Sequence, residues 1–86
     1  IRVNAIAPGS VGGDRMDRVI AAEAAASGHS EAAIREDYVR TVSMRTFVTA
    51  EDVAAMAIFL ASDAGAKISG QVISVDGHTE ALGGPY

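Results

Sequence analysis

Apolar residues gather in two short runs near the ends of the chain, and an alanine-rich, mostly helical stretch separates them. The first run is I-R-V-N-A-I-A at residues 1–7, with Ala5 and Ile6 on opposite faces. Apolar residues on both faces predict a parallel strand that is covered on both sides. Pro8 cannot donate to a sheet, so we expect the strand to end there. The second run, Q-V-I-S-V, predicts a short strand over residues 71–75.

Two helices are expected after the first strand and its small-residue loop. One spans residues 14–27, where the Asp14 carboxylate caps the start and Gly28 follows the end. The other spans residues 31–42. Apolar side chains four residues apart line one face of this second helix. They are Ile34, Tyr38 and Val42.

A third helix has the clearest start, because T-A-E-D places Asp52 three residues after Thr49 as in a capping box. We expect this helix over residues 49–62. Its body from Val53 to Ala61 is apolar nearly all round, which is typical of a helix buried between a sheet and another subunit or layer. Residues 63–70 are expected to form a loop, and residues 78–86 a tail.

The order strand, three helices, strand predicts an α/β fold with a right-handed parallel crossover. Two parallel strands do not make a stable sheet alone, because parallel sheets need several strands and helices on both faces. The chain also begins at Ile1 rather than at an initiator methionine. We therefore expect the 86 residues to be a truncated or partial unit of one larger domain.

Composition excludes several classes of partner. The net charge is −4 and Lys67 is the only lysine, so no basic stripe is available for nucleic acid. The longest uninterrupted apolar run, at residues 53–61, is too short to span a membrane. No signal-peptide pattern and no cysteine occur, which favours a cytoplasmic protein without disulfides or thiolate metal sites.

Three longer strings stand in a fixed order along the chain. They are V-N-A-I-A-P-G-S-V, T-A-E-D-V-A-A-M-A-I-F-L-A-S and I-S-G-Q-V-I-S-V-D-G. In this order and spacing they closely resemble the C-terminal part of short-chain dehydrogenases/reductases, with features of the 3-oxoacyl-carrier-protein-reductase-like branch. The resemblance runs from Ile1 to about Gly77. It implies the last strand–three helices–strand unit of a Rossmann-like, doubly wound parallel sheet, in an oxidoreductase that uses NAD or NADP.

The resemblance also implies a cofactor-side loop at residues 8–13. Pro8 and Gly9 match the pair that lies beside the nicotinamide ring in the family. Val11 matches the residue whose backbone N–H and C=O hold the carboxamide, and Gly13 stands where the family often has a threonine. The expected cofactor-binding residues are Pro8, Gly9, Ser10, Val11 and Gly13.

The same resemblance assigns roles to the remaining elements. The helices within residues 14–45 resemble a substrate lid, and Arg15 is a candidate for the border of a substrate channel. The helix from Val53 to Ala61 and the strand from Gln71 to Val75 resemble the family's usual subunit interface, which implies a homo-oligomer. The implied substrate is a moderately hydrophobic carbonyl/alcohol pair.

Two other interpretations of the loop remain open from the residues alone. Pro8 and Gly9 can simply end a strand and turn the chain. Alternatively, G-S-V-G-G between a strand and a helix could cradle a phosphate. This string is not G-x-G-x-x-G, however, and Asp14 would repel an anion from the helix amides.

The catalytic groups of the family have no counterpart in this chain. Its glycine-rich T-G-x-x-x-G-x-G turn is missing, and so is Tyr-x-x-x-Lys, because Tyr38 is followed four residues later by Val42. We therefore expect no catalytic residue here and no NAD(P) binding by these residues alone. His29 is expected to be exposed, His78 to lie near the active-site rim or an interface, and no His, Asp and Glu spacing predicts a metal site.

Two functional hypotheses follow. In the first, the chain supplies the nicotinamide-side loop, the substrate lid and the subunit interface of an NAD(P)-dependent oxidoreductase. In the second, it is a non-catalytic, stand-alone oligomerisation or interaction module derived from that family. The first is favoured because Pro8, Gly9 and Val11 keep the cofactor-facing pattern.

Overall fold

A parallel pair of strands and three helices make up the computed structural model, which describes residues 1–80. In chain order the elements are β1 (Ala5–Pro8), α1 (Asp14–Ser27), α2 (Glu31–Val39), α3 (Ala50–Ala61), the 3-10 helix η1 (Asp63–Gly65) and β2 (Val72–Val75). The predicted α/β class and the parallel pairing of the two end strands are confirmed. The expected tail lies outside the described residues from position 81 onward.

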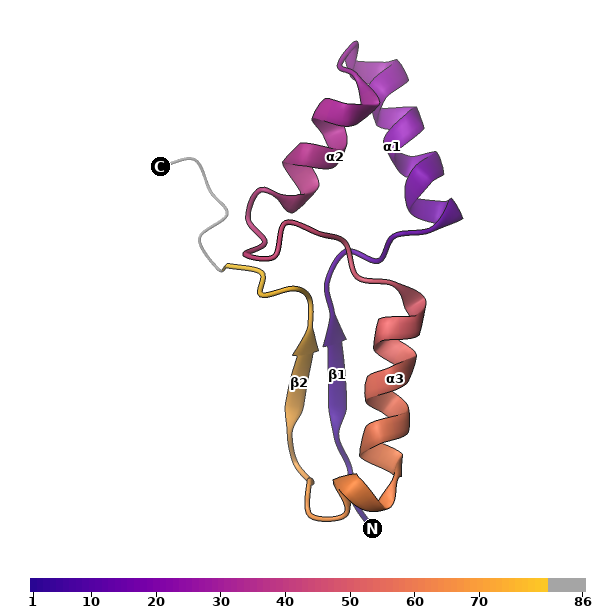
Figure 1. The fold of residues 1–86 in the computed structure, drawn as a ribbon. Coiled ribbons are helices and arrows are strands. Elements are labelled where there is room, and N and C mark those ends of the chain that lie inside the picture. The colour runs from indigo at the N-terminus through magenta and orange to yellow at the C-terminus, as the bar shows by residue number, and fades with distance from the viewer. Residues whose placement is uncertain (81–86) are drawn as a thin grey trace.

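Two separate bodies are visible in Figure 1. The helix α3 lies along the β1–β2 sheet, whereas α1 and α2 form a hairpin beyond the carboxyl ends of the strands. Neither α1 nor α2 packs against β1, β2 or α3 within the described chain. The hairpin and the sheet body are therefore joined through the loops alone.

Pro8 belongs to β1, so the predicted strand over residues 1–7 is wrong at both ends. The amide of Gly9, directly after Pro8, donates to the carbonyl of Val75 at 3.0 Å. Since alternate residues face the neighbouring strand, Pro8 directs its hydrogen-free nitrogen to the opposite edge and breaks no bond to β2. At its start β1 is shorter than predicted, but its pairing with the chain before β2 continues through the Gly70 amide, which donates to the Val3 carbonyl at 2.7 Å.

The helix α1 has the predicted bounds but a different cap. Gly13 is the N-cap, with φ at 135°, and no side chain makes a capping bond. Asp14 is therefore not the cap, because the positive φ of Gly13 turns the chain directly into the helix and leaves Asp14 inside the first turn. There its carboxylate still complements the helix dipole. The end at Gly28 is as predicted, with a left-handed conformation at φ 78°.

The helix α2 ends at Val39, three residues before the predicted end at Val42. Val42 instead forms an antiparallel bridge with Thr79 and is 6% exposed. It lies against Gly77, where a Cβ would come within 2.9 Å of the valine side chain. Burial of Val42 at this crossing outweighs the one further turn of helix that the spacing favoured.

The start of α3 is the predicted capping box. The Thr49 hydroxyl accepts from the Asp52 amide at 3.1 Å, and the Asp52 carboxylate accepts from the Thr49 amide at 2.8 Å. In the described residues α3 packs against the sheet on one side, and its burial by another subunit or layer stays a prediction. Leu60 is its only buried residue, while Ile58 is 70% exposed, because a two-stranded sheet covers only one side of the helix.

The end of α3 is fixed by a side chain from the start of the chain. Arg2 donates to the carbonyls of Leu60 at 2.7 Å and Gly65 at 2.8 Å. These bonds occupy carbonyls that a helix end otherwise leaves without partners. The predicted loop over residues 63–70 accordingly begins with η1, which turns the chain tightly back toward β2.

Candidate functional site

The loop after β1 is held from one side by the segment that precedes α3. The Val48 amide donates to the Ser10 carbonyl at 3.0 Å, and the Gly12 amide donates to the Val48 carbonyl at 2.8 Å. These two bonds make a parallel bridge between Val11 and Val48. Val48 is 6% exposed, so the residue that makes the bridge is itself buried.

The same bridge leaves the backbone of Val11 available on the other side. In a parallel bridge of this kind, Val48 bonds to the neighbours of Val11 and not to Val11 itself. Within residues 1–80, the N–H and C=O of Val11 make no hydrogen bond. The loop therefore offers one donor and one acceptor side by side, beyond the carboxyl ends of parallel strands where open α/β sheets bind ligands.

A hollow of about 540 Å³ opens beside this loop. Four of the five predicted cofactor-binding residues line it, namely Gly9, Ser10, Val11 and Gly13; Pro8 lies just before them in β1. Gly12 and the first turns of α1 complete the lining. The α1 residues are Asp14, Arg15, Met16 and Val19. The lining is thus mainly apolar, with one acidic and one basic side chain in it.

Gly9 has a structural reason to be glycine. A Cβ at this position would lie 2.7 Å from the Cβ and 2.9 Å from the Cα of Asp76. Contacts under 3 Å with backbone are not tolerated, so a side chain here would separate the loop from the end of β2. The strand-end interpretation of Pro8 and Gly9 is thereby supported, and it is compatible with a ligand on the opposite side of the loop.

The phosphate-cradle interpretation fits the geometry poorly. A cradle needs free backbone amides, but the Gly12 amide is bonded to Val48 at 2.8 Å. Asp14 occupies the first turn of α1 and lines the hollow, where its charge opposes that of a phosphate. A neutral amide group suits the Val11 edge better than an anion does.

Tyr38 lies outside any arrangement for proton transfer. Its hydroxyl donates to the Glu23 carboxylate at 2.7 Å. This hydrogen bond, together with slight desolvation and the charge of Glu23, raises the pKa of the phenol above its ordinary 10.0. An acid or base for chemistry near neutral pH needs a lowered phenol pKa, so the environment of Tyr38 points away from catalysis.

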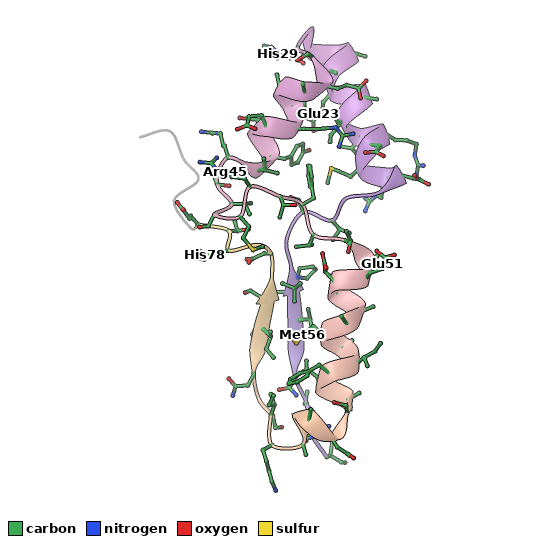
Figure 2. All side chains as sticks on the ribbon, in the orientation of Figure 1. Glu23, His29, Arg45, Glu51, Met56 and His78 are labelled. Carbon is green, nitrogen blue, oxygen red and sulfur yellow. The ribbon has the colours of Figure 1, made fainter. Side chains whose placement is uncertain are left out.

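The two histidines lie far apart, His29 at the tip of the hairpin and His78 near the middle of the molecule (Figure 2). His29 is exposed at the tip of the hairpin. His78 follows β2 and adopts a left-handed backbone with φ at 66°. Its Nδ1 lies 2.8 Å from the Ser43 hydroxyl oxygen, and its amide donates to the Asp76 carboxylate at 2.9 Å.

His78 also borders a second hollow of about 620 Å³, on the side of the loops that faces α3 and β2. Apolar side chains from the hairpin base and from α3 form part of its wall. They include Met44, Phe47 and Met56. The sequence placed His78 at a rim or interface, and the structure puts it at the edge of this second hollow.

Metal chemistry and membrane insertion find no support in the part of the chain that the structure describes. No group of three or more His, Cys, Asp and Glu side chains in residues 1–80 is placed to hold a metal ion. None of the helices described there has both the length and the apolar character needed to cross a bilayer.

A strand–helices–strand crossover with a ligand loop at the carboxyl strand ends defines part of an open α/β sheet. Comparison with known proteins agrees. The family model described as enoyl-(acyl carrier protein) reductase matches residues 1–78. The crystal structure of a short chain dehydrogenase family protein from Francisella tularensis superposes with a TM-score of 0.80 at 28% identity, covering 90% of this chain and 32% of that one. The chain belongs to the short-chain dehydrogenase/reductase family.

Named relatives share about a third of their matched residues with this chain. The 3-oxoacyl-[acyl-carrier-protein] reductase FabG of Rickettsia felis is 36% identical over 77 residues, which are 90% of this chain and 27% of that protein. The NADPH-dependent reductase BacG of Bacillus subtilis is 34% identical over 77 residues, 90% of this chain and 30% of that protein. The chain thus spans under a third of the length of the relatives it matches.

Sequence patterns missed the segment that supports the loop. Phe47 and Val48 carry no motif, and the importance of Val48 lies in its bridge with Val11, almost forty positions earlier. The pair F-V directly before the capping box was the one local signal, since an aromatic residue next to a β-branched one is typical of a short extended segment.

Proposed function

We propose that this chain forms the nicotinamide-side loop, the substrate lid and a subunit contact of an NAD(P)-dependent oxidoreductase that interconverts a carbonyl and an alcohol. The family relationship and the names of reductase relatives support the reaction class. The groups for proton and hydride transfer lie outside these residues in this proposal. A cytoplasmic location is proposed with it, supported by the lack of cysteine in the sequence.

The observation that carries the proposal is the free backbone edge of Val11. Its N–H and C=O lie side by side without partners in residues 1–80, while the neighbouring amide of Gly12 is bonded to Val48. A primary carboxamide such as that of nicotinamide has one acceptor and two donors, so it can bond both groups at once. The flat ring would then lie along the glycine-rich side of the loop.

The lid role is supported by the wall that α1 gives to the hollow. Met16 and Val19 add apolar surface to the lining, and Arg15 adds a basic side chain. Such a wall suits a substrate with a moderately hydrophobic body next to its reacting carbon.

A backbone substitution tests the Val11 contact. In the full-length protein, Val11→Pro removes the free N–H without breaking a bond described here, and Val11→Ala keeps it. We expect fluorescence titration with NADH and NADPH to show binding weakened about tenfold in Val11→Pro and within about twofold of wild type in Val11→Ala. Circular dichroism checks that both variants are folded. Unchanged affinity in Val11→Pro would contradict the proposal.

The same titration on the 86-residue chain alone separates this proposal from the second functional candidate. We expect no measurable binding by the chain alone, because it lacks the family's glycine-rich turn. An isolated chain that forms stable oligomers and has no larger counterpart, as judged by intact mass, would favour a stand-alone interaction module instead.

A homo-oligomer contact through α3 and β2 is part of the proposal. Ile58 and Phe59 on α3 are 70% and 44% exposed, and Val72 on β2 is 72% exposed. Exposed apolar side chains on one helix and an adjoining strand favour burial against a neighbour. Ile58→Asp should reduce the oligomer mass measured by sedimentation, whereas Ala57→Asp on the same helix controls for the added charge.

A further inference from the structure

Phe47 stands where the hairpin, the loop after β1 and the start of α3 meet. Because α1 and α2 do not pack on the strands or on α3, the hairpin depends on contacts near its base for its position. One such contact is between the rings of Tyr38 in α2 and Phe47, whose centroids are 6.1 Å apart with an interplanar angle of 44°. This separation is within the range of a favourable aromatic pair.

On its other side Phe47 lies against the loop. A Cβ at Gly12 would be 3.4 Å from the Phe47 Cβ and 3.9 Å from its Cγ, so the Phe47 side chain lies next to the position that a side chain on Gly12 would take. The next residue, Val48, makes the two backbone bonds to Ser10 and Gly12. Phe47 therefore lies beside Gly12, and its neighbour Val48 holds the loop on the edge opposite the free groups of Val11.

Tyr38 links Phe47 to both helices of the hairpin, because it belongs to α2 and is bonded to α1. The Tyr38 hydroxyl is bonded to Glu23 of α1 at 2.7 Å, and Figure 2 shows Glu23 between the two helices. A second link, from Arg35 to Asp17 at 2.7 Å, also joins α2 to α1. The hairpin is thus tied together internally, and a shift at Tyr38 shifts α1 with it.

We propose that Phe47 is a positioning residue that sets the distance between the α1 wall and the Val11 edge of the hollow. The inference rests on the proposed function, because it concerns the site in which cofactor and substrate would meet. One part of the lining belongs to the loop and the other to α1, and Phe47 lies beside Gly12 of the loop and pairs with Tyr38 of the hairpin. Small displacements of such walls weaken productive binding strongly.

The experiment compares cofactor affinity with substrate KM in the full-length protein. Phe47→Ala removes both contacts, so we expect the NADPH or NADH Kd and the KM of a carbonyl substrate each to rise about fivefold or more. Tyr38→Ala removes only the hairpin side, and should raise the substrate KM about fivefold with the cofactor Kd within about twofold of wild type. Phe47→Leu, which keeps an apolar contact with the loop, should restore most of the cofactor affinity.

Two controls separate positioning from simple loss of folded protein. Ile34→Ala alters another partly buried residue of α2 that is not in the ring pair, and Tyr38→Phe keeps the ring but loses the bond to Glu23. A merely structural role would lower the folded fraction and hence the apparent kcat, with Kd and KM unchanged in every variant. That result would overturn the positioning role. Wild-type protein that binds neither cofactor would instead overturn the proposed function itself, and the inference with it.

Discussion

The sheet body and the hairpin use different means to hold their shape. In the body, β1 and β2 share a backbone ladder, Thr49 and Asp52 cap α3, and Arg2 bonds to the carbonyls at its far end. The hairpin is tied by exposed polar contacts between α1 and α2, and Ile20 is its one fully buried side chain within the described residues. Exposed ion pairs contribute little to stability, so the hairpin depends on few apolar contacts.

This difference suits the two roles that we propose, a cofactor loop held by the sheet body and a substrate lid formed by the hairpin. A body fixed by backbone bonds holds the Val11 loop in place, whereas a weakly anchored hairpin can be repositioned around a substrate. Regions that open locally are drawn from the parts of a protein with few buried contacts. The comparison leads to four predictions, ordered by the size of the expected effect.

The stability of the sheet body should be most sensitive to a substitution at Gly65. A Cβ there would come within 2.6 Å of the Leu60 carbonyl oxygen and 2.8 Å of that of Phe59, at the turn where Arg2 also binds. We expect Gly65→Ala to lower the free energy of unfolding by about 4 kcal/mol, since backbone must move to admit the methyl group. Chemical denaturation measures the loss. Ala64→Ser, at the exposed neighbour, should change stability by less than about 0.5 kcal/mol.

The stability of the hairpin should be most sensitive to a substitution at Ile20, which is 0% exposed. Ile20→Ala is expected to cost about 3 kcal/mol through lost burial and the cavity left behind. Hydrogen exchange should show faster exchange in α1 and α2 with little change in α3, because the two bodies do not pack on each other. Val19→Ala, at a residue 37% exposed, provides the control. Equal acceleration in α3 would contradict the division into two bodies.

Loss of the α3 cap should have a smaller effect confined to the body. Thr49→Ala removes the hydroxyl that accepts from the Asp52 amide, at an expected cost of about 1 kcal/mol. Thermal unfolding measures it. Glu51→Gln, which changes an acidic residue of the same turn that has no part in the capping box, tests whether charge alone explains the change.

The smallest expected effect is the pH dependence of the hairpin. The pKa of Tyr38 is raised from 10.0, so the folded state favours the protonated phenol. The resulting stabilisation is fully present below pH 10.0 and is lost as the pH rises through the raised pKa. Tyr38→Phe should remove this alkaline loss, as measured by thermal unfolding between pH 8 and 11. An identical alkaline decline in the variant would show that another group is responsible.

Local patterns determined the types of most elements and several of their ends. The bounds of α1, the capping box at Thr49 and the glycine end at Gly28 are readable because each depends on residues within one or two turns. The two strands and their parallel pairing were also predictable, since a long helical crossover leaves few other topologies. The family strings further singled out the loop after β1, four of whose five predicted residues line the hollow.

Long-range contacts decided what these patterns missed. Val42 leaves α2 because it is buried against Gly77, and Gly13 replaces Asp14 as the cap because the loop must turn into the helix. Three further contacts join residues far apart in the chain. They are the bonds of Val48 to the neighbours of Val11, the ring pair of Tyr38 and Phe47, and the bonds of Arg2 to the carbonyls at the end of α3. Spacing along a sequence reports which residues share a helix or strand face, whereas only the packed structure shows which faces and backbone edges meet.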